Sequence, residues 1–437
     1  MKFDIIVCID KSNGIGYNNN IPWDLKPDMK YFKELTTNST IIMGRNTWES
    51  LPKKPLPNRQ NLVISSVLKD SCKSLDEALK QSICSKIFVI GGQKLYEEAL
   101  QHSKCRYVYL TRIDKVFKCD RFFELTDQYT LVSQSEMHEY NSLNYTFNKY
   151  KKKNIDEINY LTLLKSILNT GVEKNDRTGT GTISTFGQRL EFDLDNGFPL
   201  LTTKQVPFKL MVKELLWFIS GSTDNKVLKE QGVHIWDGNT TKEFIINRGL
   251  SYEEDDLGPM YGFQWRNAGA EYKSCKDKYK GVDQLLNAID LIRNDPDSRR
   301  IIINSYQAHD LDKMVLHPCH AMVQFWVNKG ELSCQMYQRS ADMFLGVPVN
   351  IASYALLTHI MAKTTGLKAK RLIIVYGDAH IYKNHIDQVN TQLKRNPKPF
   401  PTLKIKNIYS DITKYKLEDF ELENYEHDSR IKGKMAI

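Results

Sequence analysis

The sequence lacks any long apolar run, because no stretch approaches the roughly 18 consecutive apolar residues that a membrane span needs. The apolar run near its N-terminus, residues 5–9, is too short for the hydrophobic part of a signal peptide, and Asp10 and Lys11 follow it at once. The sequence therefore predicts no membrane association and a cytoplasmic location.

Regularly spaced cysteines are also missing. The eight cysteines include no C-x-x-C pair, so the sequence indicates neither a zinc site nor a disulfide framework, and no metal site is predicted. This pattern favours a reducing compartment. A catalytic thiol would stay available there.

A strong excess of one charge is absent as well. The 61 basic and 52 acidic residues leave a net charge of +9 that is spread along the chain. Such a balance suits anionic small molecules as well as nucleic acid, so it does not discriminate between them, and no nucleic-acid partner is required. The 437 residues are enough for two or three domains with a large core.

The most informative stretch surrounds Cys319. Cys319 lies near the start of an apolar run, residues 317–327, which predicts a buried strand. A second strand-like run follows the polar turn 328–330. The resulting hairpin would bring Cys319 next to Arg339, and a nearby guanidinium lowers a thiol pKa and favours a thiolate nucleophile. For an arbitrary Cys–Arg pair, a buried structural cysteine beside a solvated arginine is roughly nine times commoner. Other parts of the sequence have to decide between a structural and a catalytic role for Cys319.

The first 150 residues alternate strand and helix patterns. Strands are predicted at 3–9, 40–44 and 86–92, and a last pair at about 130–136 and 144–150. Asp28 falls in the first turn of a predicted helix, where an acid is ordinarily a partner for the helix dipole. Gly91 and Gly92 join a strand to a helix, a junction that lets backbone amides approach a pyrophosphate.

These features resemble dihydrofolate reductase over nearly all of residues 1–150. The matching motifs are Gly14-Ile15-Gly16, Pro22-Trp23, P-D-M-K-Y-F-K at 27–33, I-M-G-R-N-T-W-E-S-L at 42–51, P-L-P-N-R at 55–59, V-I-G-G at 89–92 and Y-L-T-R-I-D at 109–114. The resemblance implies an α/β domain with helices flanking a sheet, and reduction of dihydrofolate by NADPH.

The resemblance also implies roles for individual residues. Asp28 would hold the pterin ring and promote protonation at N5, with a pKa raised by apolar walls. Arg59 would pair with the substrate α-carboxylate, and Arg45 would favour the 2′-phosphate of NADPH. The implied dihydrofolate site comprises Ile6, Asp28, Met29, Phe32, Leu56, Arg59 and Thr111. The implied NADPH site comprises Val7, Ile15, Gly16, Gly44, Arg45, Asn46, Thr47, Ser65, Ser66, Gly91, Gly92, Gln93, Lys94, Leu95 and Tyr96.

A polar, lysine-rich stretch then separates two domains. We predict a first domain at 1–150, a short linker at 151–155 and a second domain at 156–437. In the second domain the patterns predict helices at 155–168, 212–219 and 282–293, strands at 183–192, 301–303 and 373–382, and a loop at 257–266. An acid inside an apolar helix, such as Glu214, ordinarily lies on the solvated face.

Residues 156–437 resemble thymidylate synthase. The motifs are E-L-L-W-F-I at 214–219, D-L-G-P-M-Y-G-F-Q-W-R at 256–266, D-S-R-R at 297–300, H-P-C-H at 317–320, Q-R-S-A-D at 338–342, N-I-A-S-Y-A-L-L at 350–357 and G-D-A-H-I-Y at 377–382. The resemblance implies an α+β domain with a mixed sheet. It also implies that dUMP is methylated by 5,10-methylenetetrahydrofolate, giving dTMP and dihydrofolate.

By this resemblance Cys319 would add to C6 of dUMP, and Glu214 would organise water for proton transfers. Asn350 would bind the uracil edge. The implied catalytic residues are Cys319, Glu214, Tyr261 and Asp378, the last two acting with His320 in support of Glu214. The implied dUMP site comprises Arg177, Arg299, Arg300, Arg339, Gln338, Ser340, Asn350, His380 and Tyr382. The implied methylenetetrahydrofolate site comprises Asp342, Ile235, Leu345 and Met435, closed by the C-terminal residues 434–437.

In the family the arginines that correspond to Arg299 and Arg300 come from the neighbouring subunit, so a homodimer through the second domain is expected. Four positions depart from the usual pattern: Gln205, Tyr306, Gln307 and Val349. Val349 falls where folate is expected to pack. These departures concern folate and antifolate affinity rather than the nucleophile or the phosphate site.

Two other functions compete with this interpretation. A pyrimidine hydroxymethylase acting on dCMP would use the same scaffold, but an aspartate at position 350 would suit cytosine and Asn350 suits uracil. A catalytically idle binding or regulatory protein has no reason to retain Asp28, Cys319 and Arg339 together. The dihydrofolate released by the second domain is the substrate of the first, so the two predicted activities also make chemical sense in one chain.

Overall fold

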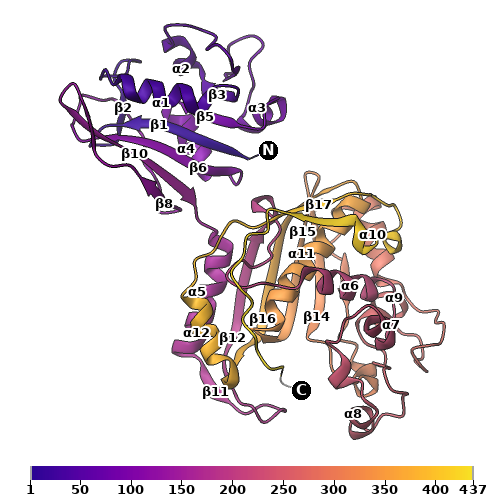
Figure 1. The fold of residues 1–437 in the computed structure, drawn as a ribbon. Coiled ribbons are helices and arrows are strands. Elements are labelled where there is room, and N and C mark those ends of the chain that lie inside the picture. Colours follow the sequence, from indigo (N-terminus) through magenta and orange to yellow (C-terminus); the bar gives the residue numbers. More distant parts are fainter. Residues whose placement is uncertain (1, 436–437) are drawn as a thin grey trace. The chain divides into compact units, whose positions relative to one another are not determined.

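A computed structural model describes residues 2–435, and the chain divides between Lys153 and Asn154 into two compact units (Figure 1). Each unit has its own sheet and its own hydrophobic core. No helix among the residues described here is long and apolar enough to cross a membrane.

The first unit is built on a mixed sheet in the order β4-β3-β5-β1-β6-β10-β8, with β9 beside β10. Strands β4, β3, β5, β1 and β6 are parallel neighbours, and β10 runs antiparallel to β6 and β8. The strands are β1 (Phe3–Ile9), β2 (Gly14–Gly16), β3 (Thr40–Gly44), β4 (Gln60–Ile64), β5 (Ile87–Gly91), β6 (Cys105–Ile113), β7 (Arg121–Phe122), β8 (Tyr129–Gln134), β9 (His138–Tyr140) and β10 (Leu143–Lys152). The helices are α1 (Lys26–Thr36), α2 (Arg45–Ser50), α3 (Leu75–Gln81) and α4 (Gln93–Gln101).

Strand β1 lies in the middle of this sheet and is covered on both faces. Phe3, Ile5, Val7 and Ile9 pack into one core cluster, whereas Ile6 packs on the other face with residues of α1. Side chains alternate across a strand, so this burial on both faces explains why residues 3–9 read as a nearly continuous apolar run.

The second unit has a six-stranded sheet in the order β11-β12-β16-β15-β14-β13. Its strands are β11 (Val172–Lys174), β12 (Thr182–Asp193), β13 (Ile302–Asn304), β14 (His320–Asn328), β15 (Glu331–Asp342) and β16 (Lys368–Tyr382), and β17 (Thr402–Ile405) pairs separately with β18 (Phe420–Glu423). Its helices are α5 (Ile155–Thr170), α6 (Phe208–Ile219), α7 (Asn225–Glu230), α8 (Lys242–Asn247), α9 (Tyr261–Asn267), α10 (Gln284–Asn294), α11 (Gly346–Thr364) and α12 (Ile386–Leu393).

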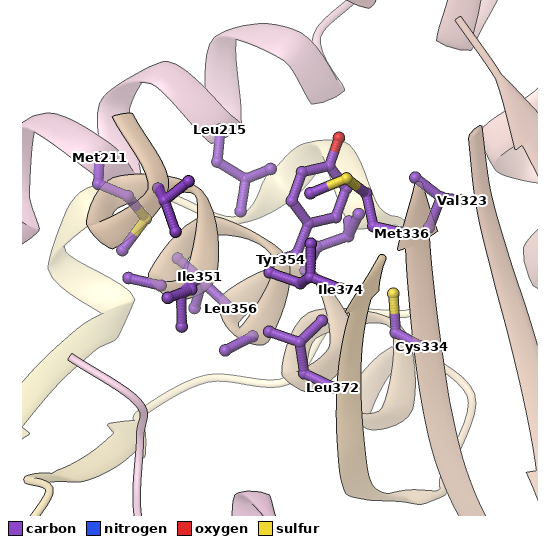
Figure 2. Packing of buried hydrophobic residues seen from close by; sticks show 14 of the residues in the cluster. Met211, Leu215, Val323, Cys334, Met336, Ile351, Tyr354, Leu356, Leu372 and Ile374 are labelled. Carbon is purple, nitrogen blue, oxygen red and sulfur yellow. The ribbon is translucent and has the colours of Figure 1, made fainter. Parts of the chain in front are cut away.

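Helix α11 is the centre of the second core. It is largely apolar and mostly buried, and it packs between the sheet and α6, as Figure 2 shows. Ile351, Tyr354 and Leu356 of α11 meet Met211 and Leu215 of α6, and side chains of β14, β15 and β16 complete the cluster. Burial of most of this helix explains why the stretch after Leu345 has no continuous polar face.

The prediction of a loop at 257–266 is wrong for the second half of that range, because residues 261–267 form α9. Pro259 lies just before this helix, and the Gln264 side chain donates to the Pro259 carbonyl over 2.9 Å. Trp265 is fully buried and donates to Ser305 over 3.0 Å. Tertiary packing of the aromatic residues, rather than local propensity, makes this short helix.

Glu157, in the first turn of α5, ties that helix to the chain at Thr202 and Thr203. It is fully buried and accepts bonds from both backbone amides and both hydroxyls, at 2.7 to 3.0 Å. Glu157→Ala would leave these donors unpaired, so we expect it to lower the free energy of unfolding by about 2–4 kcal/mol. Urea unfolding measures this, and the exposed Glu230→Ala serves as a control that should change little. Equal stability of the two variants would contradict the prediction.

Candidate active sites

Cys319 lies directly before β14, and Arg339 lies opposite it on β15. The backbone amide of Arg339 donates to the Cys319 carbonyl over 2.9 Å. The Arg339 side chain donates to the carbonyls of Pro318 (2.9 Å) and His317 (2.8 Å). The prediction that a hairpin brings the thiol and the guanidinium to neighbouring strand ends is confirmed.

The expected lowering of the thiol pKa is wrong. Burial raises the pKa of Cys319, and the charge of Arg339 opposes this without overcoming it. The guanidinium is committed to two backbone carbonyls, while the thiol loses hydration. The thiol of Cys319 is therefore protonated at neutral pH.

Tyr261 and Glu214 lie beside the nucleophile. The Tyr261 hydroxyl accepts from the backbone amides of Cys319 (2.8 Å) and His320 (3.4 Å). Glu214 is only 9% exposed, so the expectation of a solvated face is wrong. Burial raises its pKa to about 7, although Trp236 Nε1 donates to its carboxylate over 2.9 Å. A group with this pKa can both accept and donate a proton near neutral pH.

Asn350, on α11, is held by two neighbours. Gln338 Nε2 donates to Asn350 Oδ1 over 3.0 Å and to the Ser340 carbonyl over 3.1 Å. Burial lowers the pKa of His320 to about 4, and a hydrogen bond with Asn350 opposes this shift. A neutral imidazole and an anchored amide fix the direction in which Asn350 presents its donor and acceptor.

His380, Tyr382 and Asp378 come from the end of β16. His380 Nδ1 lies 3.1 Å from Asp378 Oδ1, and that bond is the largest cause lowering the pKa of Asp378 to about 2. Burial raises the pKa of Tyr382 to about 12, the charge of Asp342 adds to this shift, and that of Arg177 opposes it. These residues thus meet around one site.

Arg299 and Arg300 are separate from this group. Both are exposed and lie just before β13, where Gln324 donates to the Arg299 carbonyl over 3.0 Å. Within residues 2–435, neither side chain forms a hydrogen bond with Cys319, Arg339 or Arg177. Of the four arginines expected at the phosphate, Arg339 lies beside Cys319, and the charge of Arg177 acts on Tyr382.

Two of the residues expected to bind methylenetetrahydrofolate, Asp342 and Leu345, lie just before α11. Asp342 Oδ1 accepts from the amides of Phe344 (3.0 Å) and Leu345 (3.1 Å). Ile235 and Leu345 are half-buried, and Met435 is 47% exposed. His385 lies 2.9 Å from the Lys434 carbonyl, an anchor that the sequence did not indicate. Of the closing segment 434–437, Ala436 and Ile437 lie outside the described residues.

In the first unit, Asp28 has the environment that was expected. Burial raises its pKa, and hydrogen bonds from Thr111 and Cys8 oppose the shift. Thr111 is buried on β6, directly beside Cys8 of β1. Neither Cys8 nor Trp236 of the second unit was predicted, because each acts on a carboxylate that is distant in sequence and no local pattern marks the pairing.

Ile6, Phe32 and Leu56 belong to one apolar cluster on the face of the sheet that α1 covers. Ile6 is buried, Phe32 and Leu56 are half-buried, and Met29 is 55% exposed. The Arg59 guanidinium lies 5.5 Å from the centre of the Phe32 ring, and burial lowers its pKa. Arg59 Nε has no hydrogen-bond partner within residues 2–435, so this guanidinium can donate to a carboxylate.

Strands β3 and β5 are parallel neighbours that end at Gly44 and Gly91, and each leads into a helix. A Cβ on Gly91 would lie 2.8 Å from Thr47 Oγ1, so a larger residue at position 91 would clash with Thr47. Tyr96 of α4 donates to the Ile6 carbonyl over 2.8 Å. The other residues expected at the cofactor differ in exposure. Val7, Ser65 and Leu95 are buried. Half-buried are Ile15, Gly16, Arg45, Gly92 and Gln93, and exposed are Asn46, Ser66 and Lys94. Glycines at two strand ends and a cation at Arg45 fit a dinucleotide with an extra phosphate.

Comparison with known proteins gives the same assignment for each unit. The profile of the dihydrofolate reductase family matches residues 2–152, and that of the thymidylate synthase family matches residues 158–437. A bifunctional dihydrofolate reductase–thymidylate synthase of Paramecium tetraurelia is 45% identical over 100% of this chain and 99% of its own. Those of Zea mays and Leishmania major are 42% and 40% identical, over 100% of this chain and 97% and 95% of their own.

The expected activities, fold types and cofactors are thereby confirmed. One domain reduces dihydrofolate to tetrahydrofolate with NADPH, and the other methylates dUMP with 5,10-methylenetetrahydrofolate, which gives dTMP and dihydrofolate. The chain belongs to the family of bifunctional dihydrofolate reductase–thymidylate synthases.

Proposed function

We propose that Cys319 is the nucleophile that adds to C6 of dUMP. The observation that carries this role is the hairpin that fixes Cys319 beside Arg339, with Tyr261 bonded to the amide of the nucleophile. Addition of sulfur to C6 makes C5 nucleophilic, so C5 can take the one-carbon unit from the folate. The raised pKa of Cys319 means that a proton has to leave as dUMP binds.

Glu214 is the group that handles protons around the pyrimidine and the folate. Its pKa of about 7 and its bond to Trp236 support this role. Asp378 has a pKa of about 2, so it stays ionised and positions His380 for the ribose instead of exchanging protons. Tyr382 completes the ribose contact.

Asn350 selects uracil by accepting from N3–H and donating to O4. The bond from Gln338 and the neutral His320 support a fixed orientation of its amide. An enzyme that acts on dCMP would need the opposite pattern at N3, so the hydroxymethylase alternative is disfavoured. Val349 and Met435 line the folate side, where this chain departs from the family pattern.

Four arginines bind the dUMP phosphate: Arg177 and Arg339 from one subunit, and Arg299 and Arg300 from its partner in a homodimer. The exposed face of the second sheet supports such an interface. It carries Met322, Trp326 and Tyr337, which are 38%, 53% and 37% exposed. Apolar side chains gathered on one sheet face are a feature of an isologous interface.

In the reductase domain, Asp28 holds the pterin and promotes protonation at N5, Thr111 supports that carboxylate, and Arg59 binds the substrate carboxylate. NADPH supplies the hydride, and the residues at the ends of β3 and β5 hold it. The reductase domain spans 1–150, the linker 151–155 and the synthase domain 156–437. The eight free cysteines support a cytoplasmic location.

Mixing two inactive variants tests the shared site. Cys319→Ala protein and Arg299→Ala/Arg300→Ala protein should each make little dTMP. Refolded together as an equimolar mixture, they should regain about one quarter of the wild-type rate, because half of the dimers are hybrid and each hybrid has one intact site. A mixture as inactive as its components would refute the shared site, and separately refolded variants are the control.

A further inference from the structure

Cys8 occupies a defined place in the first sheet. In the parallel register of β1 and β6, Cys8 is paired with Thr111. Alternating residues of β1, such as Val7 and Ile9, point into the core on the opposite face. Paired residues of parallel neighbours project from the same face, so the thiol and the Thr111 hydroxyl leave the sheet side by side.

The chain ahead of α1 covers this face. Trp23 and Leu25 pack with Cys8 in one cluster, and Asp28 follows in the first turn of the helix. The Trp23 indole N–H donates to the Cys8 sulfur, and the thiol donates to the Asp28 carboxylate. Thr111 supplies a second donor to the same carboxylate.

Four titratable groups of the described residues interact with this pair. They are Asp10, which directly follows β1, and three tyrosines whose pKa values Asp28 raises: Tyr31 of α1, Tyr96 of α4 and Tyr145 of β10. Since none of these four is a cation, hydrogen-bond donors are what stabilise the ionised carboxylate among them. Two side chains, Cys8 and Thr111, supply those donors.

We propose that Cys8 is a positioning residue of the reductase site, whose thiol links the Trp23 indole to the Asp28 carboxylate and holds that carboxylate toward the pterin. An alanine would leave both neighbours without this link. The thiol also sets the proton affinity of Asp28 and thereby the pH range of hydride transfer. This inference rests on the role proposed above for Asp28.

The pH profile of hydride transfer in the full-length protein tests the proposal. Loss of a donor to the ionised carboxylate favours its protonated form, so Cys8→Ala should move the falling limb upward by about one pH unit. Cys8→Ser keeps a donor and should restore the wild-type position. Cys84→Ala, a half-buried cysteine of the same unit, is the matched control and should leave the profile unchanged.

Two results would overturn the proposal: a Cys8→Ala profile that superimposes on the wild type, or a Cys8→Ser profile displaced as far as that of Cys8→Ala. Affinity for NADPH, measured by fluorescence titration, shows that each variant is folded. Asp28→Asn separates the two hypotheses. If the Asp28→Asn profile keeps the falling limb of the wild type, the proposed role of Asp28 is wrong. If Asp28→Asn lacks the falling limb but Cys8→Ala shows it at the wild-type pH, only the proposed role of Cys8 is wrong.

Discussion

Cys319→Ala is expected to abolish dTMP formation, with a loss on the order of 10⁴-fold or more, because no covalent bond to C6 can form. Dihydrofolate reduction by the same preparation should proceed at the wild-type rate, since the reductase residues belong to the other unit. Parallel assays of the two reactions measure this. Substantial dTMP formation by the variant would rule out Cys319 as the nucleophile.

The raised pKa of Cys319 adds a second measurement on the wild-type protein. Only the thiolate reacts with iodoacetamide, so alkylation of Cys319 without dUMP should be slow at pH 7 and should accelerate as the pH rises toward 9. Arg339→Ala removes the opposing cation and should slow alkylation further at every pH. Peptide mapping follows the site. A rate that is flat between pH 6 and 9 would mean that the thiol is already ionised.

The hairpin that holds Cys319 could be predicted from sequence because its determinants are local. Two apolar runs are separated by Lys329 and Gly330, both with positive φ, at 48° and 79°. Such a two-residue turn fixes the strand register, and the register brings Cys319 and Arg339 together. The strand–glycine–helix junction at Gly91 was predictable for the same reason.

Properties that arise from packing were not predictable. The sign of the pKa shift of Cys319 depends on how much hydration the thiol loses and on the carbonyls that occupy Arg339. The burial of Glu214 depends on Trp236, which lies 22 residues away in sequence. Helix α9 forms because Trp265 is buried by distant segments. Each is set by contacts between residues far apart in the chain, which hydrophobic periodicity does not record.

Asp28→Asn is expected to slow dihydrofolate reduction by about 10²- to 10⁴-fold, the usual contribution of a positioned acid or base. The amide keeps the size of the carboxyl group but cannot bring a proton to N5. dTMP formation by the same protein should be unchanged, which controls for folding of the synthase domain. Single-turnover oxidation of NADPH measures the loss, and a rate near that of the wild type would exclude Asp28 from the proton transfer.

The same substitution should make the protein more stable at neutral pH. Burial raises the pKa of Asp28, whereas aspartates of an unfolded chain titrate near about 3.9. Above that pH the folded protein holds a proton that the unfolded chain has released, so the free energy of unfolding falls as the pH rises through the folded pKa. The amide of the variant does not titrate, so the gain in melting temperature from Asp28→Asn should grow between pH 4 and pH 7. Scanning calorimetry measures it. A difference that does not change with pH would show that Asp28 binds its proton no more tightly in the folded protein, and its strength as an acid would then have another source.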